Sequence, residues 1–116
     1  MPVRRGEVYD AVLDPTRDSE QAGTRPVIVV SRDAINAASN VVIAVPCTSH
    51  REGRRVYPSQ VLLRTPEGGL RTDSIALGEQ VRAISRKRLG RRRGSLSREA
   101  ASRLDQALLI ALDLPI

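Results

Sequence analysis

Short apolar runs separated by polar or glycine-containing segments make up most of the chain. The runs at residues 26–31 and 41–45 are continuous and rich in β-branched side chains. They are too short and too branched for helices, so they predict buried central strands, the second ended by Pro46. Weaker patterns predict a helical turn at residues 32–38 and further strands at residues 6–13, 59–63, 74–77 and 80–84.

The end of the chain has a different period. From Leu96 to Leu112, apolar residues recur at helical spacing, with Ser97 as the expected N-cap and Glu99 in the first turn. About six short strands followed by one helix predict a single domain over residues 1–116. Its expected fold class is mainly β (α+β), a small antiparallel barrel or half-barrel with a C-terminal helix.

Composition fits this picture. The chain has 116 residues, 41% of them hydrophobic and 28% charged, which is typical of one globular domain. No apolar run approaches the ~20 residues that span a bilayer, and no apolar segment follows the first charges as in a signal peptide. The single cysteine, Cys47, excludes an internal disulfide. We therefore expect a cytoplasmic protein without a membrane segment.

The charge is unevenly distributed. Nineteen basic residues and thirteen acidic ones give a net charge of +6, and residues 82–98 contain eight bases and no acid. Almost all the bases are arginines, whose guanidinium groups bind phosphate through two hydrogen bonds at once. This favours nucleic acid or an acidic protein as the partner. The alternative is a solvated basic face, and Arg91–Arg93 in particular could be a solvated turn before the helix.

Several kinds of site are excluded by the residues present. There is no phosphate loop, no dinucleotide fingerprint and no zinc-ligand spacing, so no metal or other cofactor is expected. The only histidine, His50, rules out a ribonuclease mechanism that needs two histidines. A carboxylate-bound metal nuclease is also disfavoured, because the acidic residues lie mostly in predicted loops.

One candidate cluster lies at the start of a predicted core strand. Arg25 follows a polar loop, expected at residues 14–24, and precedes Pro26, which favours an extended backbone at Arg25. A guanidinium held there could reach into a cleft. Alternatively, Arg25 pairs with Glu7 or Glu20 and only anchors the loop.

A second cluster lies where the other core strand is expected to end. Thr48, Ser49 and His50 place two hydroxyls and an imidazole side by side at the start of a predicted loop, residues 48–55. The alternative is an ordinary turn in which the hydroxyls satisfy backbone groups. Cys47 is expected to be a small buried apolar residue.

Together with other segments, these clusters resemble a known family. In chain order, the resemblance rests on residues 5–9, 14–15, 19–27, 46–49, 79–82 and 87–90. It spans about residues 4–112, and Glu-Gln-x-Gly-x-Arg-Pro before an apolar strand, at residues 20–26, is quite specific. The sequence resembles the MazF/PemK family of toxin endoribonucleases.

The resemblance implies an SH3-like barrel of the plasmid-maintenance-toxin type that works as a homodimer. It implies the toxin of a type II toxin-antitoxin system, an mRNA interferase that inhibits growth and is neutralised by an acidic antitoxin protein. It also implies sequence-specific, metal-independent cleavage of single-stranded RNA. The products would be a 2′,3′-cyclic phosphate and a 5′-hydroxyl.

The family motifs place Arg25 and Thr48 at the catalytic pair. An immobilised arginine can stabilise the charge that develops on the phosphate oxygens during attack by the 2′-hydroxyl. The group that takes the proton stays open between Glu20 and His50. Unpaired RNA bases are read by their edges, and the expected RNA-binding residues are Gln21, Ser49, Gln80 and Arg82.

Two rival functions use the same charge and fold. The first is a toxin without catalytic activity that binds a protein target such as a topoisomerase; the presence of both Arg25 and Thr48 favours the nuclease instead. The second is a basic RNA-binding module, which would have no need for the motif at residues 20–26.

Overall fold

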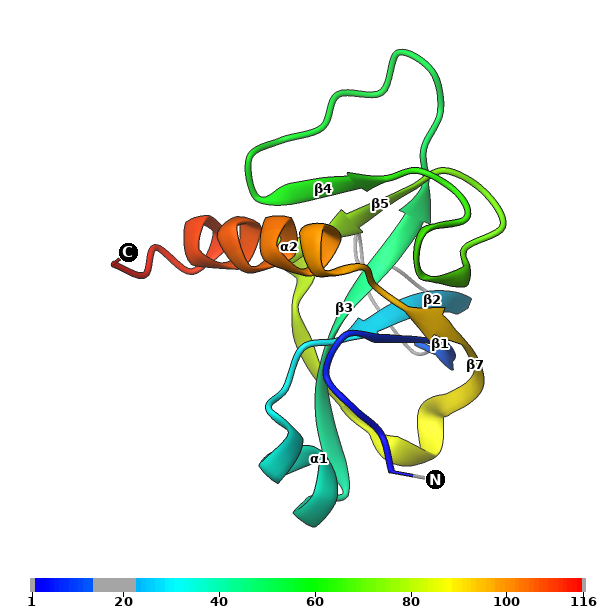
Figure 1. Cartoon of the computed structure of the whole chain (residues 1–116), viewed down its shortest axis with the longest axis vertical. Helices are drawn as coiled ribbons and strands as arrows, with labels where there is room; N and C mark the ends of the chain where they lie inside the picture. The colour runs from blue at the N-terminus through cyan, green and yellow to red at the C-terminus, as the bar shows by residue number, and fades with distance from the viewer. Residues whose placement is uncertain (1, 14–22, 116) are drawn as a thin grey trace.

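The computed structural model describes residues 2–13 and 23–115. Most of the loop predicted at residues 14–24 lies outside these residues. The described chain forms seven strands, two α-helices and three short 3₁₀ helices (Figure 1). In order they are β1 (Glu7–Val12), β2 (Thr24–Val29), α1 (Asp33–Ala38), β3 (Val41–Ser49), β4 (Gln60–Leu63), η1 (Glu67–Gly69), β5 (Ser74–Leu77), η2 (Gly78–Gln80), β6 (Arg82–Ser85), η3 (Arg86–Arg88), β7 (Leu89–Ser95) and α2 (Arg98–Ala111).

All strand pairs in the described chain are antiparallel, and β3 is at their centre. The order is β4-β5-β3-β2-β1-β7, with β6 paired to the first half of β3. One edge of β3 pairs with β2, while the other pairs first with β6, at residues 41–44, and then with β5, at residues 47–49. The predicted mainly β fold with a C-terminal helix is confirmed.

Apolar side chains are buried on both sides of this sheet. Val8, Ile28 and Val45 belong to one buried cluster, which α2 joins through residues that include Leu104. Their chain neighbours, such as Val27 and Ala44, belong to a second cluster. Because successive side chains of a strand point to opposite faces, a strand with a core on each side needs a continuous apolar run. This explains the uninterrupted runs that identify β2 and β3.

Helix α2 follows its predicted pattern. The Ser97 hydroxyl accepts a hydrogen bond from the Ala100 amide at 3.1 Å, and Glu67 accepts bonds from the Ser97 amide and hydroxyl. Leu104 and Ala107 are buried, whereas Leu112, just past the helix end, is half exposed. Neither this helix nor α1, the other α-helix in the described ranges, is long and apolar enough to cross a membrane.

The predicted end of β3 at Pro46 is wrong. The strand continues through Pro46 to Ser49, so Thr48 and Ser49 lie in a strand and not in a loop. Pro46 lies opposite Val27 of β2, between the residues that pair with β6 and those that pair with β5. Proline has no amide hydrogen to donate. This is tolerated at Pro46 because the partner strand on the other edge of β3 changes there from β6 to β5.

Strand β7 was not predicted, and the interpretation of Arg91–Arg93 as a solvated turn is wrong. They belong to β7, in which Arg92 pairs with Tyr9 of β1, and Arg92 and Arg93 form ion pairs with Glu7 (2.7 Å) and Asp10 (2.9 Å) of that strand. The basic segment at residues 82–98 therefore finds its acidic partners in the neighbouring strand β1. Cross-strand pairs of opposite charge stabilise a strand that has no apolar alternation of its own.

Glu7 is a buried carboxylate of β1 that is bonded to Arg92 of β7. Burial alone would raise its pKa, but bonds from the Arg4 amide, Arg92 and the Tyr9 hydroxyl outweigh burial and hold the pKa below its ordinary value of 4.5. A lowered folded-state pKa stabilises the fold fully above the ordinary value, and this stabilisation is lost as the pH falls through the folded-state value.

We therefore expect Glu7→Gln to lower the free energy of unfolding at pH 7 and to make its decline below pH ~4.5 shallower than in the wild type. Urea unfolding between pH 7 and pH 3 measures both effects. Curves of equal acid slope would show that Glu7 contributes nothing to acid sensitivity.

Candidate active site

The strands β2 and β3 bring the two predicted catalytic residues together. Their register pairs Val29 with Ala44 and Val27 with Pro46. Arg25 and Thr48 each lie two residues beyond the Val27–Pro46 pair, near the ends of the same two strands. The arrangement follows from two core strands that leave the core side by side.

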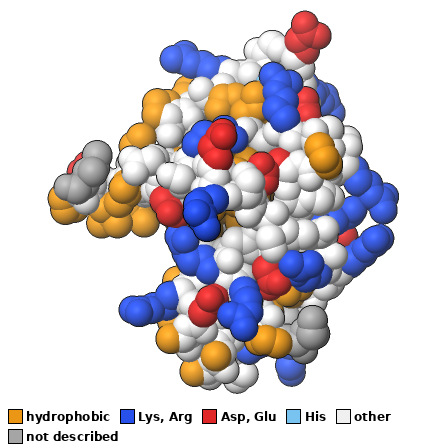
Figure 2. Space-filling view, in the orientation of Figure 1, with side chains coloured by type: hydrophobic (Ala, Val, Ile, Leu, Met, Phe, Trp, Pro, Cys, Tyr) orange, Lys and Arg blue, Asp and Glu red, His pale blue; other side chains and the backbone are white. Residues whose placement is uncertain are grey.

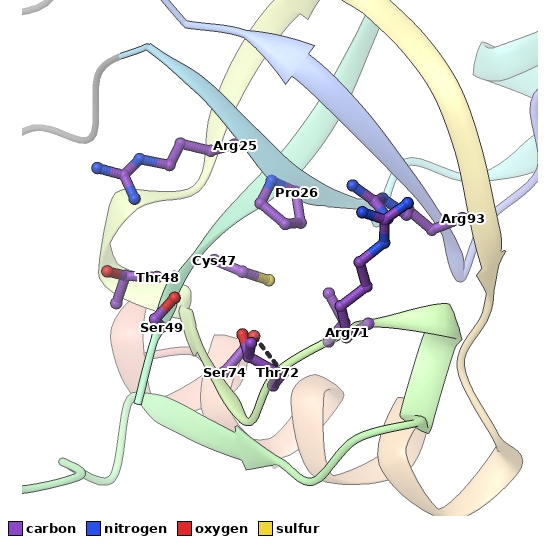
Figure 3. A pocket seen from close by; sticks show the side chains of 10 residues that line it. Arg25, Pro26, Cys47, Thr48, Ser49, Arg71, Thr72, Ser74 and Arg93 are labelled. Carbon is purple, nitrogen blue, oxygen red and sulfur yellow. Dashed lines mark hydrogen bonds between the residues drawn. The ribbon is translucent and has the colours of Figure 1, made fainter. Parts of the chain in front are cut away.

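A cleft of about 140 Å³ lies at these strand ends (Figure 3). Its wall combines β2 and β3 with the segment that leads into β5 and with β7. Of the described residues, those lining it are Arg25, Pro26, Cys47, Thr48, Ser49, Leu70, Arg71, Thr72, Ser74 and Arg93. Guanidinium and hydroxyl groups dominate, and no acidic side chain is among them. The arrangement is therefore suited to an anion.

Strand alternation divides this site into two sides. Figure 3 shows Arg25 and Thr48 projecting together at one end, while Cys47 points the other way, toward Arg71 and Arg93. Side chains that are adjacent in a strand point to opposite faces, so Arg25 and Thr48 cannot share a direction with Cys47. The two groups of cations thus lie at separate positions along the site.

Cys47 is buried at the base of the cleft. Burial raises the pKa of its thiol to about 12. A thiol with that pKa is uncharged at neutral pH and is a poor nucleophile. The expectation that Cys47 is a small buried apolar residue is confirmed.

The remaining predicted site residues are distributed differently. Ser49 lines the cleft. His50 borders a separate hollow of about 410 Å³ with Glu52, Arg64 and Asp73, and its amide donates to the Asp73 carbonyl at 2.8 Å. Gln80 and Arg82 lie in η2 and β6, away from the cleft wall, and Glu20 and Gln21 fall outside the described residues.

Five lining residues outside the two predicted clusters were not predicted as site residues, namely Leu70, Arg71, Thr72, Ser74 and Arg93. Arg71 and Thr72 belong to an irregular segment between η1 and β5, and Arg93 belongs to the unpredicted strand β7. The only signals they carry are the polar residues at 71–74 and, for Arg93, the basic segment at residues 82–98. Their place in the cleft depends on long-range pairing.

Metal ligands do not gather in this part of the protein. Across residues 2–13 and 23–115, no group of three or more His, Cys, Asp or Glu side chains is arranged to hold a metal ion. The chemistry that the described cleft offers is that of arginine and hydroxyl donors.

Comparison with known proteins extends these observations. Residues 4–112 match the family described as PemK-like, MazF-like toxin of type II toxin-antitoxin system. The chain is 43% identical over 117 residues to Endoribonuclease MazF9 of Mycobacterium tuberculosis, covering 97% of this chain and 98% of that protein.

Solved structures agree in fold. An endoribonuclease in complex with its cognate antitoxin from a mycobacterial species is similar with a TM-score of 0.81, at 26% identity over 98% of each chain. MazF of Deinococcus radiodurans is similar with a TM-score of 0.82, at 23% identity over 98% of this chain and 99% of that one.

Proposed function

Since the chain belongs to the family of PemK-like, MazF-like toxins of type II toxin-antitoxin systems, we propose that it is the endoribonuclease of such a system. It cleaves single-stranded RNA in the cytoplasm, with Arg25 and Thr48 as catalytic residues. The observation that carries this proposal is that Arg25 and Thr48 lie together in the wall of an arginine-lined cleft, at the ends of β2 and β3. An acidic antitoxin protein inhibits it.

The reaction is an internal transesterification. The ribose 2′-oxygen forms a bond to phosphorus, the bond from phosphorus to the 5′-oxygen breaks, and the leaving oxygen takes a proton. The products are a 2′,3′-cyclic phosphate and a 5′-hydroxyl. Arg25 contacts one non-bridging oxygen and the Thr48 hydroxyl donates to the other, so both stabilise the charge of the transition state.

An arginine side chain stays protonated and does not accept the proton of the 2′-hydroxyl. Glu20 and His50 are the candidates for that role. In RNA recognition, Ser49 acts from the cleft wall, and Gln21, Gln80 and Arg82 read base edges. Figure 2 shows basic side chains on the side of the molecule where β7 lies, which suits a polyanionic substrate.

Cleavage is expected to need a 2′-hydroxyl and no divalent metal. Purified protein should cut a long single-stranded RNA equally well with and without EDTA, and mapped 5′ ends should share a short sequence. An RNA with a single 2′-deoxynucleotide at the scissile position should stay intact because the nucleophile is missing. Strict dependence on added Mg²⁺ or Mn²⁺ would contradict the mechanism.

The active form is a homodimer built on an apolar face at the end of α2. Leu112 and Leu114 are half exposed and border a groove of about 350 Å³ with apolar residues such as Ile43 and Val81. Figure 2 shows apolar side chains gathered around the outer end of α2. Exposed apolar surface of this kind is typical of protein interfaces.

We expect the protein to sediment at twice 12.7 kDa and Leu112→Glu to sediment at 12.7 kDa. Leu112 lies outside the core, so the variant should keep its thermal midpoint. Val12→Glu, an equally exposed position on β1, is the matched control and should stay dimeric. A wild-type monomer at micromolar concentration would contradict the dimer.

A further inference from the structure

Arg93 lines the cleft in a fixed orientation. Its side chain is only 20% exposed, and its Nε–H donates to Oδ1 of Asp10 at 2.9 Å. Asp10 is itself mostly buried, and β1 and β7 are paired, so the ion pair belongs to a rigid part of the sheet. A guanidinium has five N–H donors, and this bond uses one of them. No other described residue takes up the remaining four.

Arg71 lines the same end of the cleft as Arg93 but comes from a different segment of the chain. It is exposed, in the segment between η1 and β5, and no described residue forms a hydrogen bond or ion pair with its guanidinium. Figure 3 shows Arg71 and Arg93 on the same side of the cleft, away from Arg25. Thr72 and Ser74 line the cleft as well, whereas Ser49 lies beside Thr48.

The two pairs of groups face different positions. In Figure 3, Arg25 and Thr48 lie at one end of the cleft, and Arg71 and Arg93 lie at the other end, on the side to which Cys47 points. Consecutive phosphates of one RNA strand can occupy these two positions, because two guanidinium groups with a neighbouring hydroxyl are suited to a phosphodiester.

We propose that Arg71 and Arg93 form a second phosphate subsite, which holds a phosphate next to the scissile one, and that Asp10 positions Arg93 for this role. This inference rests on the proposed endoribonuclease function. It assigns the cleft to RNA rather than to carboxylates of an acidic protein, because the subsite is continuous with the wall that carries Arg25 and Thr48.

Binding is measured with an RNA that has a 2′-deoxynucleotide at the scissile position, so that no cleavage interferes. For single strands, log affinity falls with log salt by about 0.7 per phosphate contact, so Arg71→Ala should reduce the slope by ~0.7. Arg32→Ala is the matched control: Arg32 is exposed, caps α1 without a side-chain bond and lies outside the cleft wall, so its slope should equal that of wild type.

A second series locates the phosphate. Single uncharged methylphosphonates are placed at each position around the scissile bond. At one neighbouring position the substitution should weaken wild-type binding and have no further effect on Arg71→Ala. Asp10→Asn should raise KM with kcat near wild type, whereas a purely structural role would lower the thermal midpoint and leave KM unchanged.

The subsite is overturned if the RNA affinity of Arg71→Ala depends on salt as steeply as that of the wild type. It is also overturned if the losses in affinity from Arg71→Ala and from the methylphosphonate are independent at every position. It is also overturned if Arg71→Ala weakens binding of a polyglutamate peptide alone, which would assign the cleft to an acidic protein. Failure of the proposed function looks different, because the wild type itself would then leave RNA uncut. If Arg25→Ala abolishes cleavage and Arg71→Ala cleaves like the wild type, only the proposed subsite is contradicted and the proposed function stands.

Discussion

Arg25→Ala is expected to lower the rate of RNA cleavage by about 10²–10³-fold, the range found when one transition-state donor is removed from an enzyme. The loss follows from the place of Arg25 beside Thr48 in the cleft wall, where the guanidinium stabilises charge on the phosphate oxygens. Arg25→Lys should rescue little, because lysine keeps the charge but loses the two-pronged geometry. Single-turnover cleavage under EDTA measures the chemical step.

Two comparisons make this result specific. Thr48→Val, which removes the hydroxyl but keeps the shape, should also slow cleavage without a change in thermal midpoint. His50→Ala separates the roles of the imidazole: a large loss in kcat would identify it as the acid or base, and a loss confined to KM would identify it as a reader of bases. Near-normal turnover by Arg25→Ala would show that the catalytic centre lies elsewhere.

Gly69→Ala is expected to lower the free energy of unfolding by roughly 3 kcal/mol. Gly69 has φ of +75°, and a Cβ atom there would overlap the carbonyl of Arg93. The left-handed backbone accounts for about 1–2 kcal/mol of the effect and the steric overlap for about 1–3 kcal/mol. Urea unfolding at pH 7 measures the total.

Gly53→Ala is the matched control for the backbone term. Gly53 has φ of +85°, but a Cβ atom there would meet nothing within 4 Å. Its loss should therefore be limited to the ~1–2 kcal/mol of the left-handed conformation. Equal losses in the two variants would show that the contact between η1 and β7 adds nothing to stability.

Much of the candidate site follows from local patterns. The apolar runs of β2 and β3 locate two core strands, and the polar residues at their ends include Arg25, Thr48 and Ser49. What local patterns do not determine is the register. A shift of one residue between β2 and β3 would set Arg25 opposite a side chain on the other face. Only the paired structure shows that Arg25 and Thr48 project together.

The other half of the cleft could not be predicted for a physical reason. Strand β7 contains three arginines and two glycines, so it has neither the alternation nor the composition of a strand. Its stability comes from Glu7 and Asp10, which lie more than eighty residues earlier in the chain. Interactions at that separation leave no periodic trace in either segment.

The shared pairing of β3 has a consequence for how the protein opens. Thr48 lies in β3, which pairs with β2 at residues 44–46 and with β5 at residues 47–49, so the amides of this strand should exchange with deuterium only through large openings of the sheet. Arg71 lies on an exposed segment outside the sheet, where exchange proceeds through small local openings. The wall of the cleft that β3 forms is thus rigid, whereas the wall that contains Arg71 can change its conformation to fit the bound RNA.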